Sequence, residues 1–239
     1  MSIFNSLGMD DRKVEKTVGV VCGVVTNNQD PDKLARIKIT FPWLSDDNET
    51  DWVRMTTLMA GPQQGSFFLP EVGDEVLVAF EHGDMNHPYV IGVLWNGESK
   101  PPEDNSNGKN NIRKIKSRSG HEIVFDDNAE EKKEKLEIKT NAGHMIVLDD
   151  ASGKEKIEVS SKSGHKIVMD DAPGGEKIEI ADKSGNNKIV IDTVKKAIAV
   201  ESGMEIKIKS TKVAVEASGS LDLKTDGILS IKGSLVKIN

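Results

Sequence analysis

Three histidines recur at one position of an internal repeat, and their chemistry raises the question of a metal site. His121, His144 and His165 each follow a glycine, and successive histidines are 23 and 21 residues apart. Imidazole is a good ligand for zinc, nickel and iron, and in a three-fold assembly the copies of each histidine would meet on one axis. Metal sites, however, need more ligands and a buried second shell. We therefore expect these histidines to face solvent or a neighbouring aspartate, and we predict no metal and no other cofactor.

Paired aspartates close each copy of the same repeat. They are Asp126–Asp127, Asp149–Asp150 and Asp170–Asp171. Carboxylates suit calcium, but no loop here alternates oxygen ligands in the manner of an EF-hand. Because aspartate side chains readily accept hydrogen bonds from nearby backbone N–H groups, the pairs predict turns.

One stretch matches a nucleophile motif of acyl-transfer enzymes. Ser163 and Lys166 have the Ser-x-x-Lys spacing. The equivalent repeats carry Glu122 and Met145 in place of the lysine, so the match is incidental. Phosphate loops and nucleophile elbows are also missing from the sequence. We predict that the chain is not an enzyme.

The elements that must position these residues are short repeated strands. The stretch 119–127 returns as 142–150 and 163–171, and a looser copy over 184–192 carries one extra residue. Apolar and polar residues alternate in each copy and again in the segments between copies, such as Ile157-Glu158-Val159. Alternation is the period of a strand with one buried face. Each repeat is therefore predicted to be two strands joined by an Asp/Gly turn.

Farther along, the repeating unit shortens to about one strand per eight residues. The apolar positions follow at Ile206–Ile208, Val213–Val215, Leu221–Leu223 and Ile231. A strand that buries two aliphatic side chains gains too little to offset its backbone entropy. Stacked repeats share a continuous interior. The interior could be that of one chain coiled into a solenoid or of three chains wound into a prism; strands this short favour three chains.

The N-terminal part has a different composition. Strands are expected over Thr17–Thr26, Arg36–Phe41, Trp52–Leu58, Gly65–Leu69, Glu75–Phe80 and Val90–Leu94, with a turn cluster at Asn27–Asp32. Five or six short strands in about 80 residues predict a small β-barrel. The predicted organisation is an N-terminal segment (1–15), a barrel (16–97), a linker (98–111) and a repetitive all-β stalk (112–239).

Composition separates the same two regions and excludes several functions. Residues 1–97 carry 7 Lys/Arg and 14 Asp/Glu, whereas residues 98–239 carry 25 of each. A barrel with a net charge of −7 is a poor nucleic-acid binder. Four aromatic residues of the barrel are therefore expected in core or subunit contacts rather than on a stacking platform for nucleic acid or sugar. They are Trp43, Trp52, Phe67 and Phe68. Cys22 is the single cysteine, and the start of the chain has no secretory signal pattern, so we expect synthesis in the cytoplasm.

The barrel and the repeats resemble those of one protein family. Residues 25–31, 36–43 and 52–54 look like the oligonucleotide/oligosaccharide-binding (OB) barrel of phage baseplate assembly protein V. Residues 65–80 and 87–97 resemble the same barrel in type VI secretion VgrG spikes, and the Gly-His-x-Ile-Val-x-Asp-Asp repeats are similar to the triple-stranded β-helix of that family.

The resemblance implies the central spike of a contractile injection machine in a phage tail, tailocin, type VI apparatus or extracellular particle. Such a spike is a homotrimer seated on a baseplate hub protein and capped by a PAAR-repeat tip protein, and it touches a target membrane transiently when the machine delivers it outside the cell. With about 15 residues before the barrel, the hub is expected to be a separate chain. The last segment would end in an apolar plate that contacts the tip protein through Leu229, Ile231, Leu235, Val236 and Ile238. The alternative is a trimeric receptor-binding or glycan-processing tail fibre.

Overall fold

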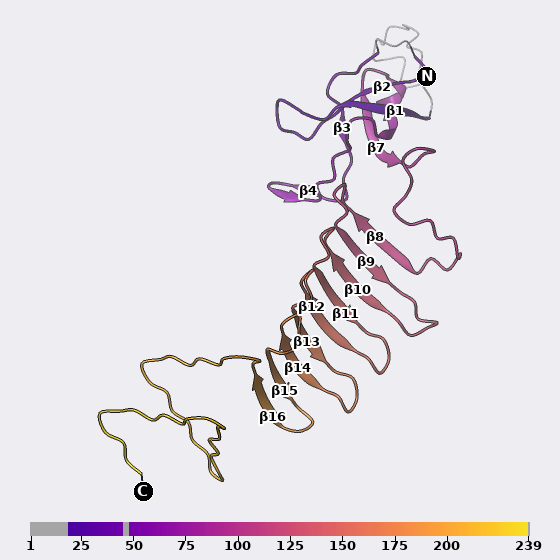
Figure 1. Ribbon diagram of the computed structural model, residues 1–239. Coiled ribbons are helices and arrows are strands. Elements are labelled where there is room, and N and C mark those ends of the chain that lie inside the picture. The colour runs from indigo at the N-terminus through magenta and orange to yellow at the C-terminus, as the bar shows by residue number, and fades with distance from the viewer. Residues whose placement is uncertain (1–18, 45–47, 239) are drawn as a thin grey trace, which may run out of the picture. The chain divides into compact units, whose positions relative to one another are not determined.

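The computed structural model describes residues 19–44 and 48–238 and divides the chain after Lys109 into two compact units. The predicted segment 1–15 and the first residues of the predicted strand Thr17–Thr26 lie outside the described residues. Both units are built from strands, and the described residues contain no α-helix, only one 3₁₀ turn at Glu81–Gly83 (Figure 1). The predicted all-β fold class is confirmed.

The first unit contains a five-stranded sheet in the order β2-β1-β6-β7-β3. Its strands are β1 (Val20–Asn27), β2 (Lys38–Thr40), β3 (Arg54–Met55), β6 (Glu75–Phe80) and β7 (Pro88–Leu94). The two outer strands are brought together by an antiparallel bridge between Ile37 and Val53, whose backbone groups exchange hydrogen bonds of 3.0 and 2.7 Å. The sheet thus curves back on itself as an OB-type barrel. A separate hairpin pairs β4 (Ala60–Gly61) with β5 (Gln64–Gly65).

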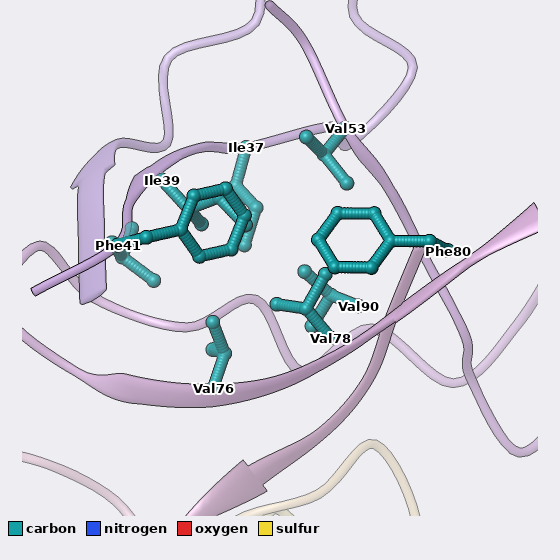
Figure 2. Packing of buried hydrophobic residues seen from close by; sticks show 9 residues of the cluster. Ile37, Ile39, Phe41, Val53, Val76, Val78, Phe80 and Val90 are labelled. Atoms are coloured by element: carbon teal, nitrogen blue, oxygen red, sulfur yellow. The ribbon is translucent and has the colours of Figure 1, made fainter. Parts of the chain in front are cut away.

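The barrel interior is filled by the inward residues of alternating strands. In β6, Val76, Val78 and Phe80 are buried while the residues between them are half-buried. The rings of Phe41 and Phe80 lie 5.9 Å apart at the centre of the cluster (Figure 2). The buried cluster consists of Val25, Ile37, Ile39, Phe41, Val53, Val76, Val78, Phe80 and Val90.

One predicted barrel strand is wrong. Only Gly65 of the predicted strand Gly65–Leu69 lies in a strand, and the side chains of Phe67 and Phe68 are 74% and 66% exposed. The physical reason is that the two phenylalanines are adjacent and both face outward, so this segment lacks the alternation that a half-buried strand requires.

The predicted turn cluster is organised around one carboxylate. The side chain of Asp30 is 2% exposed and accepts hydrogen bonds from the backbone N–H groups of Asp32, Leu34 and Arg36. The Arg36 guanidinium donates two more, at 2.9 and 2.7 Å. These donors, Arg36 above all, hold the pKa of Asp30 far below its usual range. The loop is therefore held by a part-buried ion pair.

The second unit is a nine-stranded antiparallel sheet in which every strand pairs with the next along the chain (Figure 1). Each strand has five residues: β8 (Ile112–Lys116), β9 (Glu122–Asp126), β10 (Lys135–Lys139), β11 (Met145–Asp149), β12 (Lys156–Ser160), β13 (Lys166–Asp170), β14 (Lys177–Ala181), β15 (Lys188–Asp192) and β16 (Ala197–Glu201). The sequence prediction of two strands per repeat is confirmed. We call this sheet the stalk sheet.

The C-terminal strands predicted beyond β16 do not form within the chain. Described residues 202–238 hold no strand, although their apolar alternation continues, and nearly all of them are exposed. Described residues 204–238 also make no backbone-to-backbone hydrogen bond. Strands need a hydrogen-bonded neighbour, and this segment of a single chain has none.

Candidate functional site

One face of the stalk sheet is apolar and uncovered. The paired registers align apolar residues in two columns across the strands. One column is aliphatic in all nine strands and contains Ile138, Ile146 and Val159 along β10, β11 and β12, and the other is apolar from Phe125 on β9 onward. We call this side the apolar face. Its exposed large residues are Ile115, Phe125, Ile138, Ile146, Leu148, Ile157, Val159, Ile167, Met169, Ile178, Ile180, Ile189, Ile191, Ile198 and Val200, with exposed fractions between 37% and 73%. A monomeric protein rarely leaves so many contiguous apolar side chains in water.

The opposite side, the charged face, is better covered than the apolar one. Glutamates and valines alternate down its central column, for example Val147, Glu158 and Val168. Lysines pair with the glutamates along this face, with Lys177 and Lys166 lying 3.0 and 3.1 Å from Glu179. These contacts, first that of Lys177, lower the pKa of Glu179. Val168, in this central column, is only 8% exposed. This face is adapted to water.

The three histidines lie along one edge of the apolar face. Figure 1 shows the turns at the two edges of the sheet, and we call the edge formed by turns 117–121, 140–144, 161–165 and 182–187 the histidine edge. The Nδ1 atom of each histidine accepts a hydrogen bond from a backbone N–H of the next turn on that edge. Asn141 donates to His121 at 3.2 Å, and Lys162 donates to His144 at 3.2 Å. Each histidine thus ties its repeat to the following one.

The fourth repeat replaces the histidine by an asparagine with the same role. The Oδ1 atom of Asn187 accepts hydrogen bonds from the Gly203 backbone N–H at 3.2 Å and from the Ser202 hydroxyl at 2.9 Å. Sequence reasoning missed Asn187, because the extra residue in this repeat shifts it out of alignment. The shared property of the four positions is a hydrogen-bond acceptor rather than a metal ligand.

The structure assigns the other chemical motifs to local roles. The first aspartates of two pairs make turns: Asp149 and Asp170 each accept the backbone N–H of the residue two positions on, at 3.0 Å. Lys166 of the Ser-x-x-Lys match pairs with Glu179 at 3.1 Å, whereas the Ser163 hydroxyl contacts that of Ser161. Among residues 19–44 and 48–238, no group of three or more His, Cys, Asp or Glu side chains is arranged to hold a metal ion.

The aromatics of the barrel are on its surface more than in its core. Trp43 is 50% exposed, Phe67 and Phe68 are more exposed still, and Trp52 is half-buried with Lys38 over its ring. The prediction of a core role is wrong for Trp43, Phe67 and Phe68, because the barrel interior is already filled by Phe41, Phe80 and aliphatic residues. Their predicted role in subunit contacts stays a prediction.

The five predicted tip residues are exposed in the single chain. Their exposed fractions range from 49% to 89%, and none lies in a strand. They are Leu229, Ile231, Leu235, Val236 and Ile238. The described chain also contains no helix with the length and hydropathy of a membrane span.

Comparison with known proteins relates the barrel to one family. Residues 21–95 match the family described as the type VI secretion system/phage-baseplate injector OB domain. The barrel is therefore similar to injector OB domains. The chain is also 30% identical over 125 residues to the type VI secretion system spike protein VgrG5 of Pseudomonas aeruginosa, covering 44% of this chain and 16% of the relative.

Two relatives from Vibrio cholerae match shorter stretches. The spike protein VgrG3 is 36% identical over 75 residues, and the actin cross-linking toxin VgrG1 is 39% identical over 75 residues. Each match covers 30% of this chain and 7% of the relative. The resemblance of the chain to VgrG-type spikes is confirmed, and the chain spans a sixth or less of the length of these relatives.

Proposed function

We propose that this protein is the central spike of a contractile injection machine: a homotrimer, seated on a baseplate hub and capped by a tip protein, that punctures a membrane mechanically. The observation that carries the proposal is the uncovered apolar face of the stalk sheet. Three copies arranged around one axis would turn their apolar faces inward and their charged faces to water. The similarity of the barrel to injector OB domains and of the chain to type VI spike proteins supports this use of the sheet.

The C-terminal segment supports the same arrangement. Residues 204–238 carry an alternating apolar pattern but lack backbone partners in the described chain. Because buried backbone groups are almost always hydrogen-bonded, a strand pattern of this kind requires neighbours from other chains. We propose that the three chains are interwoven here, whereas in β8–β16 each chain forms one wall of the prism.

The mechanism is force transmission. A closed prism shares its hydrogen-bonded ladders and core among three chains, so bending exposes apolar surface and is resisted. Contraction of a surrounding sheath would drive the rod forward and concentrate force on its narrow end. The Lys/Glu lattice of the charged face keeps the shaft hydrated, which gives it little affinity for a bilayer. No catalytic step is part of this proposal, and the particle, once contracted, delivers the spike outside the cell.

The end of the rod needs a partner. Three copies of the exposed residues Leu229, Ile231 and Leu235 would form an apolar plate that water disfavours. We propose that a PAAR-repeat tip protein covers this plate. A spike that lacks residues 228–239 is expected to lose capture of the tip protein; capture that persists at full strength would refute the contact.

A receptor-binding or glycan-processing fibre is the second candidate. It is favoured by the outward Phe67 and Phe68, which line a cavity of about 270 Å³ together with Leu34 and Arg54. Aromatic faces stack on sugars, so this fibre would bind glycans through the barrel and lose binding in Phe67→Ala.

The proposed spike is tested by the solution mass of the full-length chain, measured by light scattering and repeated in SDS at room temperature. We expect a species of about 78 kDa, three copies of the 26.1 kDa chain, that resists SDS until it is heated. A species of 26 kDa would overturn the three-chain prism and leave the solenoid.

A further inference from the structure

The second aspartate of each pair has no role in its own turn. Asp149 and Asp170 accept the turn N–H groups, whereas no hydrogen bond or ion pair of the neighbouring Asp150 and Asp171 side chains is found in the described part of the chain. Asp150 and Asp171 instead open loops that close with Glu155 and Glu176. These residues lie at the edge of the sheet opposite the histidine edge.

This edge carries a column of carboxylates, which we call the acidic edge. Its members are Asp127, Glu134, Asp150, Glu155, Asp171 and Glu176. The Asp150 backbone N–H donates to the Glu134 carbonyl and that of Asp171 to the Glu155 carbonyl, both at 2.9 Å, so like charges sit side by side. Strand alternation places them on the same side as the apolar face, two positions from Leu148 and Ile157. Like charges directly opposite each other destabilise a sheet unless something compensates them.

Compensation within the chain is incomplete. Asp127 pairs with Arg113. The Oε1 atom of Glu155 accepts the Gly153 N–H at 3.0 Å, and its Oε2 atom is buried without a hydrogen-bond partner in the described structure. The turns of this edge also carry lysines, namely Lys132, Lys133, Lys154, Lys195 and Lys196. Carboxylates outnumber these lysines, and Glu155 keeps an oxygen without a partner in the described structure, so the edge can still bind a cationic neighbour.

The histidine edge has the opposite charge. Its turns carry Arg118, Lys162 and Lys183, one basic residue in three of the four turns. The single carboxylate in these turns, Asp182, accepts hydrogen bonds from Asn187 and Ser184 inside its own turn, which lower its pKa to about 2. Both edges repeat once per two strands, about 9.6 Å along the sheet. The two edges are thus matched in charge and in period.

We infer that the acidic edge of one copy binds the histidine edge of a second copy of this chain, with its carboxylates against Lys162, Lys183 and Arg118. Rotation of parallel copies about the stalk axis brings these two different edges together, which is the heterologous contact that closes a ring. A groove of about 880 Å³ runs beside the histidine edge, lined by Ile146, Ile167 and Ile189 among others. In the proposed contact the apolar residues beside the acidic edge of the neighbouring copy would cover this groove. This inference rests on the proposed trimer and adds its corner contacts.

Charge reversal in the full-length chain tests the contact. Asp150→Lys/Asp171→Lys reverses one edge and Lys162→Glu/Lys183→Glu the other, and the four changes together restore opposite charges. We expect each double variant to lower the yield of refolded trimer about tenfold at low salt, and the fourfold variant to return it to within about threefold of the parent. The control Lys100→Glu changes charge in the linker, outside both edges, and should leave the yield unchanged.

The outcomes separate this inference from the proposed function. A parent chain that is monomeric overturns the spike itself. A trimeric parent whose double variants assemble as well as the control, or whose fourfold variant is no better than either double variant, overturns only the edge contact.

A second measurement does not depend on variant folding. Carbodiimide joins carboxylates to lysines in direct contact, and co-refolding of isotopically light and heavy chains marks the links that connect different chains. Mixed-isotope links from Lys162 or Lys183 to the acidic edge are expected. Mixed-isotope links that join the tryptic peptides of these lysines to other carboxylates, but never to the acidic edge, would contradict the inference.

Discussion

The imidazole Nδ1 atom of His165 accepts a hydrogen bond from the backbone N–H of Lys183, 3.3 Å away in the next turn of the histidine edge. In this contact Nδ1 acts as the hydrogen-bond acceptor of the ring. One repeat later, the amide oxygen of Asn187 accepts the corresponding hydrogen bond from the backbone N–H of Gly203. The feature that recurs along this edge is therefore a hydrogen-bond acceptor that links successive turns.

Replacement of His165 by asparagine is expected to be tolerated, whereas replacement by alanine is not. His165→Asn keeps an acceptor of the kind used at Asn187, and His165→Ala leaves the Lys183 N–H without its partner. Loss of one such bond lowers the free energy of unfolding by about 0.5–1.5 kcal/mol. Denaturant unfolding followed by far-UV circular dichroism measures the difference. Equal losses in both variants would show that the ring itself, rather than its acceptor atom, matters.

The turns of the histidine edge also demand glycine at one position. Gly164 has φ +94°, a conformation that L side chains avoid, although a Cβ there would meet only Lys183 Cβ at 3.5 Å. Gly164→Ala is therefore expected to cost about 1–2 kcal/mol of stability through its backbone. Gly175→Ala is the matched control in the same sheet, because φ at Gly175 is not in the left-handed region and a Cβ there would make only an ordinary contact with the Ala172 carbonyl oxygen at 3.6 Å. Similar unfolding midpoints for the two variants would contradict the argument.

Local periodicity made much of the stalk predictable from sequence. The Gly-His motif, the alternating Ile-Val stretch and the aspartate pair fix a turn, a strand and the next turn within about ten residues, so the register of β9, β11 and β13 follows directly. The same reasoning located the buried residues of β6, whose Val76, Val78 and Phe80 alternate.

What could not be predicted depends on contacts between distant parts of the sequence. The bridge between Ile37 and Val53 closes the barrel through two positions that carry no turn or spacing signal. Phe67 and Phe68 have high strand propensity, but neither side chain is buried against a sheet. The sequence predicts a turn role for both Asp149 and Asp150, but Asp149 alone accepts the turn N–H. The contact between chains that we propose for Asp150 leaves no signal in the sequence.

The barrel core is expected to unfold as one unit that fluorescence can follow. All three tryptophans, Trp43, Trp52 and Trp95, lie in the first unit, so their emission reports the barrel and not the stalk. Ile39 is 0% exposed, and Ile39→Ala should lower barrel stability by about 2–5 kcal/mol because it leaves a cavity. Ile91→Ala, at 40% exposure in the same unit, should cost clearly less. Comparable losses would mean that the cluster is not the core.

The part-buried ion pair of Asp30 and Arg36 predicts acid sensitivity of the barrel. Hydrogen bonds from Arg36 depress the pKa of Asp30 in the folded state. The stabilisation is therefore fully present above the ordinary aspartate pKa, about 3.9, and is lost as the pH falls below it toward the lower folded value. Barrel melting midpoints measured by tryptophan emission should drop over this range, and Asp30→Asn should flatten the dependence. Asp32→Asn is the control, since the side chain of Asp32 is 68% exposed. An unchanged acid slope in Asp30→Asn would assign the sensitivity to other carboxylates.

Hydrogen exchange in the assembled spike tests the pairing of the C-terminal segment between chains. Residues 204–238 have no backbone partner within the described single chain, yet they keep the alternation of strands at Ile206, Val213 and Leu221. If three chains are interwoven here, peptides from this segment will exchange as slowly as those of the stalk sheet, because exchange requires opening of the ladder. Peptides from linker residues 100–106, which are exposed, give the fast reference. Exchange of 204–238 at the rate of the linker would show that the stalk sheet alone holds the spike together, and removal of residues 202–239 would then leave its SDS resistance intact.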